Sequence, residues 1–465
     1  MKWKPDIQSA ISRSDMESIL SDAMRVLREI GILCENGKAA SLLADHESIF
    51  RDGDRLCFAE QAVRDHLETR RVEATPDKGD DQPFTMSGSY AALNYCVPGT
   101  GDVRPATSAE VARMIRFEDG RGVRGVVPLI PGDVPAGMVT IAAERIALEN
   151  SRGLGGSLTV TDREHVRFLG DMNAVVGRPY HLVEQIGISP LRFNGNGLLT
   201  ALEYADDPTV EVQLDGFIPM AGATCPLDPR SAIVQSTAET LAYDFTCAVS
   251  GLVGGNLVIR AEPFDMQYST IVFGSPEWCL YRALAIEMSG FLMGNTLRSG
   301  RFRSVAKRPD AQAMTERTAS VLWQSLLGIR NYGGIGQLSV DEVFSPEQAV
   351  LDGEIMAYIE RLIRGVDLDG GPDDVIELIR EGVEQGTFVG VDDTVDHFRE
   401  FFWFPEMFRH WSLGRWRDEG SPAIIAEAWA RAQEDIARST HELADEQRAE
   451  IAVIYKEAEK YTRNA

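Results

Sequence analysis

The chain has 465 residues and carries 71 acidic against 46 basic side chains, which gives a formal net charge of −25 at pH 7. A chain this acidic is poorly suited to bind nucleic acid or an anionic membrane surface. Its six cysteines stand far apart and form no CxxC pair, which argues against a zinc ribbon and against a secreted disulfide framework. The amino terminus lacks the apolar core of a signal peptide, so we expect a cytoplasmic protein with buried, reduced cysteines.

Residues 1–85 show a mixed α/β pattern and form an N-terminal extension. The pattern predicts an amphipathic helix over 16–30, a short helix over 38–45, a strand around 55–58 and a helix from Glu60. The stretch 75–83 is rich in proline, glycine and acidic residues, which is typical of a linker or surface loop. We therefore place the first domain boundary near residue 86.

From residue 86 to residue 345 short apolar segments alternate with helical patterns. About eight strand-then-helix units with nearly continuous apolar strands favour a closed parallel (β/α)8 TIM barrel, because both faces of each strand are then covered. A doubly wound open sheet is the alternative, but its GxGxxG signature is missing, since Gly195-Asn-Gly197 is only a fragment. The predicted strands are residues 90–97, 126–131, 156–160, 182–188, 210–218, 257–261, 296–299 and 331–335.

Several of the predicted helices have recognisable first residues. Thr107 with Glu110, and Thr161 with Glu164, fit capping boxes. Asp228, Ser275 and Ser345 each precede a proline, which is the pattern of an N-cap residue followed by proline at the first helical position. The first of these helices follows the stretch 217–229, which reads as a strand end, a glycine turn at Gly222 and a helix start, where a barrel enzyme keeps its site.

Residues 346–465 turn helical and form a C-terminal extension. Helices are predicted over 349–362, over 374–384 and over 421–459, the last with a break near Thr440. Between them lies a cluster of eight aromatic residues within 398–416. Such a density of aromatic side chains in a polar tail predicts docking onto the barrel or a subunit interface, so we expect a homo-oligomer.

The chain resembles the trimethylamine methyltransferase family, the MttB-like corrinoid-dependent methyltransferases. The resemblance covers nearly the whole chain and depends on an ordered set of short motifs. One departure is the stretch 389–394, which has no histidine where the family pattern has one. The matching motifs are GDVRPAT (101–107), ISPL (188–191), PMAGAT (219–224), FGSPE (273–277), DAQ (310–312), YGG (332–334), DGEI (352–355), DHFR (396–399) and FWFPE (402–406).

The resemblance implies a TIM barrel that transfers a methyl group from an amine to the Co(I) corrinoid of a separate carrier protein. Members that act on trimethylamine carry pyrrolysine, whereas this chain contains only standard residues and is similar to relatives that use quaternary amines such as glycine betaine. It implies no tightly bound cofactor in the chain itself. Two alternatives stay open: a barrel that binds methylated amines without turnover, and a different TIM-barrel enzyme such as a lyase.

A quaternary ammonium already has a neutral amine as its leaving group, so the protein needs no catalytic nucleophile and must mainly position the cation. Aromatic faces and a carboxylate suit that task. A carboxylate on the substrate would require arginine. The candidates are the aromatic residues Tyr95, Phe217, Phe264 and Tyr332, the counter-charges Glu184, Glu262 and Asp265, and the arginines Arg260, Arg298 and Arg301.

Two of these assignments have a structural alternative: each aromatic residue also fits the core, and Arg260 also fits an ion pair with Glu262. For the corrin ring, the candidates are Gly222, Gly333, Gly334 and Gly336, which would allow close approach but equally fit tight turns. No pair of the seven histidines has the spacing of zinc ligands, so no metal site is expected.

Overall fold

The computed structural model describes residues 2–5, 7, 11–73, 82–88, 90–155, 160, 162–252, 257–294, 299–368 and 374–464. The N-terminal region forms a small sheet flanked by helices, as the sequence predicts. The sheet has the strand order β3-β4-β2-β10-β9, so two strands from 187–193 complete it, and the first helix packs against α8. Its elements are β1 (Lys2–Trp3), α1 (Arg13–Glu29), β2 (Ile32–Cys34), α2 (Gly37–Ala44), β3 (Ile49–Asp52), β4 (Arg55–Phe58), α3 (Glu60–Glu73), β9 (Gly187–Ile188) and β10 (Arg192–Phe193).

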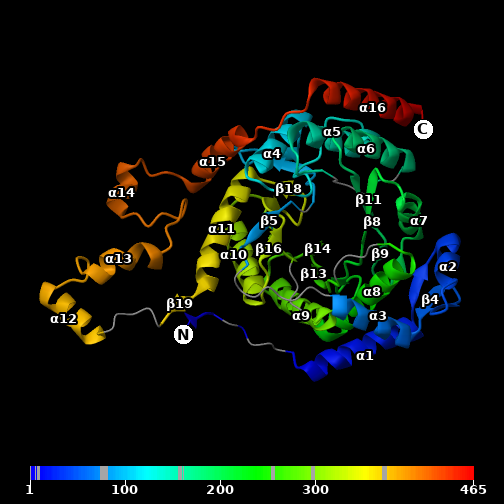
Figure 1. The fold of residues 1–465 in the computed structure, drawn as a ribbon, viewed down its shortest axis with the longest axis horizontal. Helices are drawn as coiled ribbons and strands as arrows, with labels where there is room; N and C mark the ends of the chain where they lie inside the picture. Colours follow the sequence, from blue (N-terminus) through cyan, green and yellow to red (C-terminus); the bar gives the residue numbers. More distant parts are fainter. Residues whose placement is uncertain are drawn as a thin grey trace.

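The middle of the chain alternates strands and helices. In Figure 1 helices α4 to α11 follow one another around the strands β5, β16, β13, β8 and β11. The elements are β5 (Thr85–Ser87), β6 (Asn94–Cys96), β7 (Val103–Pro105), α4 (Ser108–Gly120), η1 (Ala136–Met138), α5 (Val139–Asn150), α6 (Arg163–Val175), β8 (Tyr180–Gln185), α7 (Gly195–Tyr204), β11 (Val210–Asp215), β12 (Met220–Ala221), α8 (Pro229–Val249), β13 (Glu262–Asp265), β14 (Thr270–Ile271), α9 (Pro276–Met293), β15 (Ser299–Arg301), α10 (Ala311–Leu326), β16 (Asn331–Gly333), β17 (Gln337–Leu338), β18 (Val343–Phe344) and α11 (Pro346–Arg364).

Parallel pairing dominates among these strands, as the barrel prediction requires. Strands β15, β16 and β5 are parallel neighbours, β8 pairs with β11 over six residues, and β12 pairs with β13. Single parallel bridges link Gly125 to Leu154 and Ala92 to Leu129. Within the described part of the chain these pairs do not join into one closed sheet, and closure stays a prediction. The predicted strands 156–160 and 296–299 include residues outside the described ranges, at 156–159 and 296–298. Residues 253–256, which precede the predicted strand 257–261, also lie outside these ranges.

The first strand differs from the prediction for 90–97. The parallel partner of β16 is β5, which begins at Thr85, whereas 94–96 form β6 in a separate sheet with β7 and β18. The reason is the register of this pair. Met86 lies opposite Tyr332, so residues 90–97 lie beyond the carboxyl end of β5. The middle region therefore begins slightly before residue 86.

The predicted helix starts are mostly confirmed. Thr107 and Glu110 form a complete capping box, and Asp228, Ser275 and Ser345 each accept a hydrogen bond from a backbone N–H in the first turn. The prediction at Thr161 needs a correction. That residue lies outside the described ranges, and the cap of α6 is Asp162, whose side chain accepts a hydrogen bond from the Glu164 N–H.

The last part of the C-terminal region packs on the ring of helices. Helix α15 lies against α4 and α11, and α16 lies against α5 and α6. Helices α12, α13 and α14 extend to one side, as Figure 1 shows. The predicted break near Thr440 is confirmed. The elements are β19 (Val366–Asp367), α12 (Val375–Gln385), α13 (Asp392–Phe401), α14 (Leu413–Asp418), α15 (Ile424–Arg438) and α16 (Asp445–Asn464).

Candidate functional site

A polar cavity of about 540 Å³ lies among the parallel strands. Two of its walls are the paired strands β8 and β11, and the alternation of side chains along a strand decides which residues face it. His181, Val183 and Gln185 line the cavity from β8, while Glu211, Gln213 and Asp215 line it from β11. The intervening Leu182 and Leu214 are buried in the hydrophobic core.

Another part of the cavity wall brings together Arg260 and Arg301, with Tyr90 as the lining aromatic residue. A carboxylate oxygen of Asp215 lies 3.6 Å from Arg260 Nη2. Although burial opposes the charge of Arg260, Asp215 and Tyr90 hold its pKa above the ordinary value. Helix α8 helps to position Arg260, because the hydroxyl of Ser236 on that helix accepts a hydrogen bond of 3.0 Å from the Arg260 backbone N–H.

Arg301 is electrostatically different from Arg260. Within the described ranges its guanidinium has no carboxylate within ion-pair distance, and only its backbone atoms are hydrogen-bonded, both to the side chain of Gln324. Burial, together with Arg303 and Arg260, lowers the pKa of Arg301 to about 10. The group stays a cation at neutral pH, so this wall of the cavity carries positive charge that the protein itself does not pair.

The other charged residues around the cavity are already paired. Arg178 donates to Asn173 Oδ1 at 2.9 Å and to the Leu154 carbonyl at 3.0 Å. Glu144 accepts from Asn173 Nδ2 at 3.0 Å. His181 lies 3.1 Å from Gln213 Oε1 and 3.7 Å from Glu211. These contacts form the wall of the cavity, and among the described lining arginines Arg301 is the one without a carboxylate at ion-pair distance.

Of the predicted site residues, Arg260 and Arg301 therefore lie together in the cavity. Arg298 lies outside the described residues. Glu262 is buried, and one carboxylate oxygen accepts a 2.6 Å hydrogen bond from Trp278 Nε1, so the alternative pair of Arg260 with Glu262 is not formed and Asp215 takes that place. Asp265 lies at the β13–β14 hairpin, where Oδ1 accepts from the Gln267 N–H.

Glu184 faces away from the cavity. It lies on β8 between two lining residues, so alternation directs it toward α7, where one carboxylate oxygen would lie 3.1 Å from a Cβ added at Gly197. Its other oxygen, Oε1, is buried without a hydrogen-bond partner among the described residues. Burial raises the pKa of Glu184 to about 7. The structure thus places this carboxyl in the packing between β8 and α7.

The predicted aromatic cage is not assembled at the cavity. Tyr95 and Phe217 are buried in two different hydrophobic clusters, and Phe217 packs against Phe193 at 5.8 Å between ring centroids. Tyr332 is fully buried and shares a 2.6 Å hydrogen bond with Ser325. Phe264 pairs with Ile271 across the β13–β14 hairpin. Each of these rings is explained by packing, and none of them lines the cavity.

The predicted cofactor glycines are explained by the backbone and its close neighbours. Gly222, Gly334 and Gly336 have φ of +93°, +85° and +70°, a region that favours glycine. A Cβ at Gly336 would lie 2.7 Å from the Phe344 ring, and one at Gly334 would lie 3.1 Å from the Phe302 carbonyl oxygen. Gly333 lies in the middle of the three-stranded sheet of β15, β16 and β5. The space beside Gly334 and Gly336 is thus filled by neighbouring atoms, whereas a Cβ at Gly222 would have its nearest neighbour, Leu227 Cδ1, at 3.4 Å.

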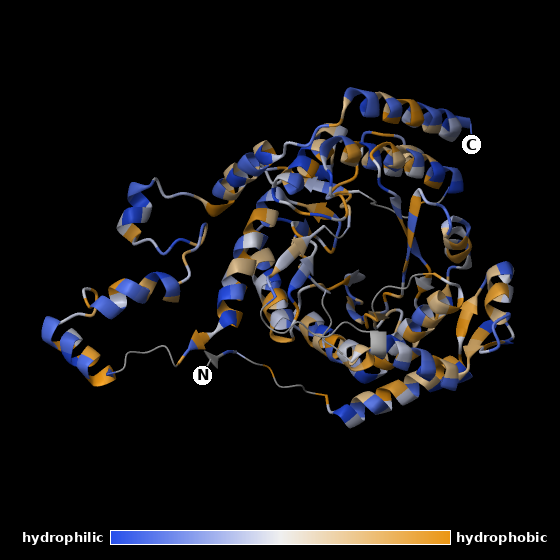
Figure 2. Ribbon diagram, viewed as in Figure 1, coloured by the Kyte–Doolittle hydropathy of each residue, from blue (hydrophilic) through white to orange (hydrophobic). Residues whose placement is uncertain are grey.

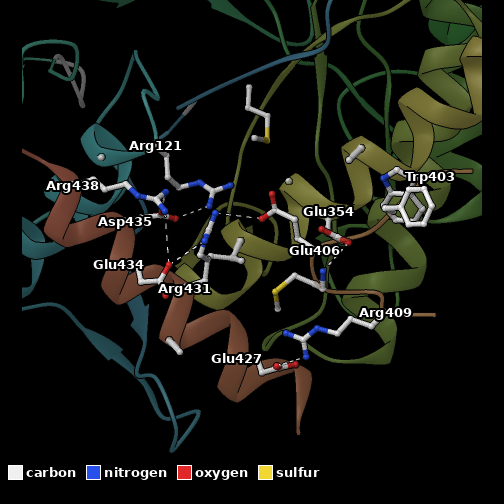
Figure 3. A pocket seen from close by; sticks show the side chains of 18 residues that line it. Arg121, Glu354, Trp403, Glu406, Arg409, Glu427, Arg431, Glu434, Asp435 and Arg438 are labelled. Carbon is white, nitrogen blue, oxygen red and sulfur yellow. Dashed lines mark hydrogen bonds and ion pairs between the residues drawn. The ribbon is translucent and has the colours of Figure 1, made fainter. Parts of the chain in front are cut away.

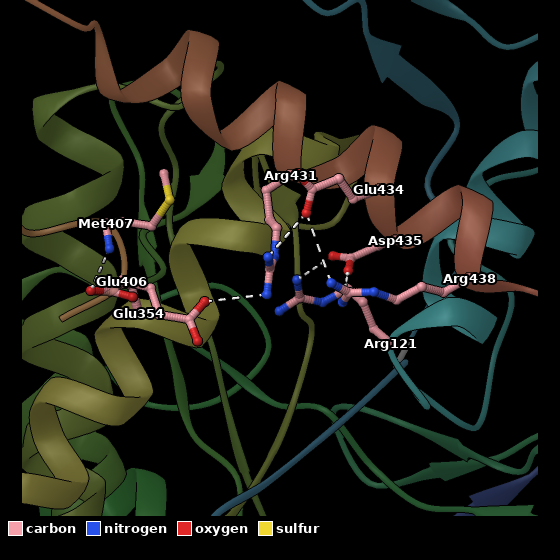
Figure 4. A network of polar contacts seen from close by, with 8 residues as sticks. All are labelled: Arg121, Glu354, Glu406, Met407, Arg431, Glu434, Asp435 and Arg438. Carbon is pink, nitrogen blue, oxygen red and sulfur yellow. Dashed lines mark hydrogen bonds and ion pairs between the residues drawn. The ribbon is translucent and has the colours of Figure 1, made fainter. Parts of the chain in front are cut away.

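A larger hollow of about 860 Å³ lies outside the ring of strands, between α4, α11 and α15 (Figure 3). Its arginines are matched by carboxylates. Arg121 Nη1 donates to Asp435 Oδ2 at 2.8 Å, Arg431 bonds to Glu434 at 3.0 Å, and Arg409 pairs with Glu427. Figure 4 shows this network joining α15 to the end of α4 and to the segment before α14. These ion pairs therefore have a structural role, because they connect α15 to its neighbours.

Cysteine, metal and membrane expectations can be compared with the described residues. All six cysteines are buried and unpaired, as predicted. The described part of the chain contains no group of three or more His, Cys, Asp or Glu side chains that could hold a metal ion. None of its helices combines the length and the apolar composition needed to cross a bilayer.

Sequence reasoning missed Tyr90, Gln185, Gln213 and Asp215. A signal for two of them was present: in 210–215 polar residues recur at every second position, which marks the polar face of a strand, whereas in 180–185 Val183 interrupts that pattern before Gln185. Tyr90 carries no such signal, because it lies three residues beyond the end of β5.

Comparison with known proteins agrees with the resemblance seen in the sequence. The family model for trimethylamine methyltransferase (MTTB) matches residues 167–456. Trimethylamine methyltransferase MttB of Methanosarcina thermophila is 29% identical over 156 residues, which span 32% of this chain and 30% of that relative, so the match covers under a third of its length.

Two longer alignments cover most of the chain. Trimethylamine methyltransferase MttB of Desulfitobacterium hafniense is 24% identical over 84% of this chain and 82% of its own length. Proline betaine:corrinoid methyltransferase of Eubacterium limosum is 22% identical over 89% of this chain and 88% of its own length. Since the family model matches more than half of the sequence, this chain belongs to the trimethylamine methyltransferase family.

Proposed function

We propose that this protein is a methyltransferase that moves a methyl group from a betaine, a quaternary ammonium that also bears a carboxylate, to the reduced corrinoid of a second protein. The printed name of the E. limosum relative supports both the betaine and the corrinoid. The unpaired cysteines support a cytoplasmic location. In this proposal residues 86–345 close into a TIM barrel around the cavity, between the N-terminal extension and the C-terminal extension.

The observation that carries the betaine assignment is Arg301. A partly buried guanidinium without a carboxylate partner is unfavourable unless a ligand supplies the anion. Arg260 lies in the same wall and would give the substrate carboxylate a second charge-assisted contact. A cavity with two arginines suits a carboxylate-bearing amine such as glycine betaine or proline betaine better than choline or a simple methylamine.

Tyr90 supports the orientation of the substrate. It lies three residues beyond the carboxyl end of β5, on the side where barrel enzymes keep their sites, whereas Arg301 is the last residue of β15 and lies level with Ser87 at the end of β5. A betaine with its carboxylate on the arginines would therefore present its ammonium to the Tyr90 ring and toward the mouth. A ring facing a quaternary ammonium contributes roughly 0.5 to 2 kcal/mol. The chain's own task is to bind, orient and partly desolvate the methyl donor.

The corrinoid enters only as the methyl acceptor on a partner, where a reduced cobalt would act as the nucleophile. Because Gly334 and Gly336 are closely surrounded by other atoms, we assign no residue of this chain to that ring. The carrier must reach the carboxyl-end side of the strands to meet the donor methyl.

The test is incubation of the purified chain with cobalamin reduced to Co(I) and a panel of glycine betaine, proline betaine, choline and trimethylamine. We expect the cobalt spectrum to change to that of the methylated cofactor with a betaine, together with one equivalent of demethylated amine. Equal turnover of choline would contradict the carboxylate assignment. Binding of betaines without methylated cobalamin would favour a non-catalytic amine-binding protein, and product formed without any corrinoid would favour another barrel reaction.

A further inference from the structure

Residues 374–420, which we name the arm, extend away from the rest of the molecule. Figure 1 shows α12, α13 and α14 to one side of the ring of helices. Among the residues of these three helices, Gly382 is the only buried one. The neighbouring α15 is different, because Ala428, Ala432 and Asp435 are buried against α4 and α11. The arm therefore lacks the tertiary packing that stabilises most helices in folded proteins.

The arm exposes an unusual amount of apolar surface. On α12 the exposed residues Ile376, Ile379 and Val383 recur at helical spacing and form one stripe. Figure 2 shows hydrophobic residues along both α12 and α13 among hydrophilic ones. The large hydrophobic side chains of the arm that are 41–79% exposed are Val375, Ile376, Ile379, Val383, Phe388, Val389, Val395, Phe401, Phe402, Phe404, Leu413 and Trp416.

This area is large enough for a stable interface. Aromatic residues present about 150–250 Å² each and aliphatic ones somewhat less, so a dozen half-exposed side chains leave on the order of 1,000 Å² of apolar surface. Monomeric proteins rarely leave more than a few hundred Å² in one patch. A standard protein interface buries about 800 Å² on each partner.

The base of the arm is held in place by specific contacts. Glu354 of α11 accepts hydrogen bonds from the Met407 and Phe408 N–H groups at 3.0 and 3.2 Å, as Figure 4 shows for Met407. Arg361 donates to the Phe401 carbonyl at 2.7 Å. The Tyr358 ring meets Trp403 edge-on at 5.5 Å. The arm is thus a preorganised projection, because these contacts fix it without covering its outer face.

The apolar surface continues from the arm onto α11. Tyr358 and Leu362 are 46% and 40% exposed, one helical turn apart, and both lie next to the contacts that fix the arm. The arm and α11 therefore form two walls of one apolar surface. A projection beside such a surface is the shape that a second identical chain can complement reciprocally.

We propose that the arm is the interface between two copies of this chain, related by a two-fold axis, with each arm packed against the arm and α11 of the other copy. A two-fold interface uses the same patch twice, so about 1,000 Å² on each copy meets the area that a stable dimer needs. A carrier of the methyl acceptor does not suit this position. It must face the carboxyl ends of the strands, whereas the arm extends sideways when the ring of helices is viewed end-on (Figure 1).

The test is sedimentation equilibrium of the full chain at micromolar concentration. One chain has a mass of 51.2 kDa, and we expect the wild type to sediment with twice that mass. The variant Ile379→Asp/Val383→Asp should sediment as one chain, with a dimer dissociation constant weakened on the order of a hundredfold, because two charges would be buried at the interface. Both positions are exposed within the chain, so an unchanged thermal unfolding curve at high dilution shows that the fold is intact.

The matched control is Val453→Asp. Val453 lies on α16, is 57% exposed and is as apolar as Val383, but belongs to a different surface. It should keep the wild-type mass. A wild-type protein that sediments as one chain, or an arm variant that keeps the dimer mass, overturns the proposal. A wild-type protein that sediments as one chain, together with loss of carrier binding by the arm variant, would assign the surface to the carrier instead.

Cross-linking gives a second readout. All native cysteines are buried, so a cysteine introduced at Val389 or Tyr358 is the reactive thiol of its chain. Mixing Val389→Cys chains with Tyr358→Cys chains and a short bismaleimide should give a product of two chains within minutes. The same mixture with Val453→Cys in place of Val389→Cys should not. Equal yields from both mixtures would contradict packing of the arm on α11 of the other copy.

Discussion

Two regions of the molecule each contain an arginine removed from bulk water, and they satisfy it in opposite ways. Under the turn at 334–337, Arg317 and Asp352 are both fully buried and form a two-point ion pair, with Arg317 Nε 2.6 Å from Asp352 Oδ1. Arg317 also donates to the carbonyl oxygens of Gly334 and Gln337. In the cavity, Arg301 has no such carboxylate among the described residues, although Arg260 and Arg303 lie close to it.

The difference separates an arginine that stabilises the fold from one that is free to bind a ligand. Around Arg317 each guanidinium nitrogen has an acceptor, and Asp352 additionally accepts from the Gly336 N–H at 2.7 Å. That arrangement fixes the turn that the motif YGG precedes. Around Arg301 the matching anion is missing from the protein. We therefore expect changes at Arg317 to act on stability and changes at Arg301 to act on binding.

The largest expected effect is at the structural arginine. Arg317→Met leaves the Asp352 carboxylate buried without its partner, which costs about 3–5 kcal/mol of unfolding free energy. Urea titration of wild type and variant measures this. Adding Asp352→Asn should recover part of the loss, since the unpaired charge is then removed. A loss below about 1 kcal/mol would show that the pair does not distinguish the two regions.

The next effect concerns pH and Glu184, the predicted counter-charge that faces away from the cavity. Burial raises the pKa of Glu184 to about 7 from its ordinary value of 4.5. Between these values the unfolded chain releases a proton that the folded chain keeps, so the contribution to stability falls as pH rises through this window. The unfolding free energy of Glu184→Gln, measured relative to that of wild type, should therefore be about 1–3 kcal/mol higher at pH 8 than at pH 5.

Urea unfolding at the two pH values checks this prediction, and calorimetry checks its second part. Because Glu184 points toward α7, the glutamine variant should bind betaine as wild type does. The same relative stability at pH 5 and pH 8 would contradict the pKa argument. A large loss of betaine affinity would place the carboxyl at the substrate after all.

A smaller effect is expected at the aromatic residue of the cavity. Tyr90→Leu removes the ring and should weaken betaine and choline alike by roughly 2- to 30-fold, the equivalent of a cation–π contact of about 0.5–2 kcal/mol. Tyr90→Phe keeps the ring and is the control, with near wild-type affinity for both ligands. If phenylalanine is as damaging as leucine, the hydroxyl and not the ring makes the contact.

The smallest effect is on the stability of the ligand-free protein at Arg301. Arg301→Gln removes no ion pair and relieves repulsion with Arg303, so its unfolding free energy should stay within about 0.5 kcal/mol of wild type. Urea titration beside Arg317→Met makes the comparison direct. A loss as large as that of Arg317→Met would mean that Arg301 is a structural residue.

Local features of this fold could be predicted from the sequence, and long-range pairing could not. Capping at Asp228 and Ser275 depends on residues a few positions apart, and strand β11 follows from its β-branched and aliphatic residues at every second position. The register that pairs β5 with β16 joins residues about 245 positions apart, and no local pattern encodes it. Closure of the ring depends on the same kind of long-range pairing, and it stays a prediction.

In the candidate site, the arginines could be predicted from the sequence and the aromatic residues could not. Arg260 and Arg301 could be predicted, because an arginine in or beside an apolar strand is retained only where it meets a counter-ion or a cavity. The rings Tyr95, Phe217 and Tyr332 could not be assigned, because an aromatic side chain suits the core and a cation site equally. Their positions depend on which face of each strand turns inward, which the structure alone reveals.

The most direct test of the betaine assignment is the ratio of the affinities for glycine betaine and choline, measured by calorimetry in wild type and in Arg301→Gln. The two ligands share the trimethylammonium group and differ in the carboxylate. We expect the variant to lose about 10- to 100-fold in betaine affinity, equivalent to a charge-assisted bond of about 1.5–3 kcal/mol, and to keep its choline affinity. Equal losses for both ligands, or no loss for either, would contradict the proposal that Arg301 holds a substrate carboxylate.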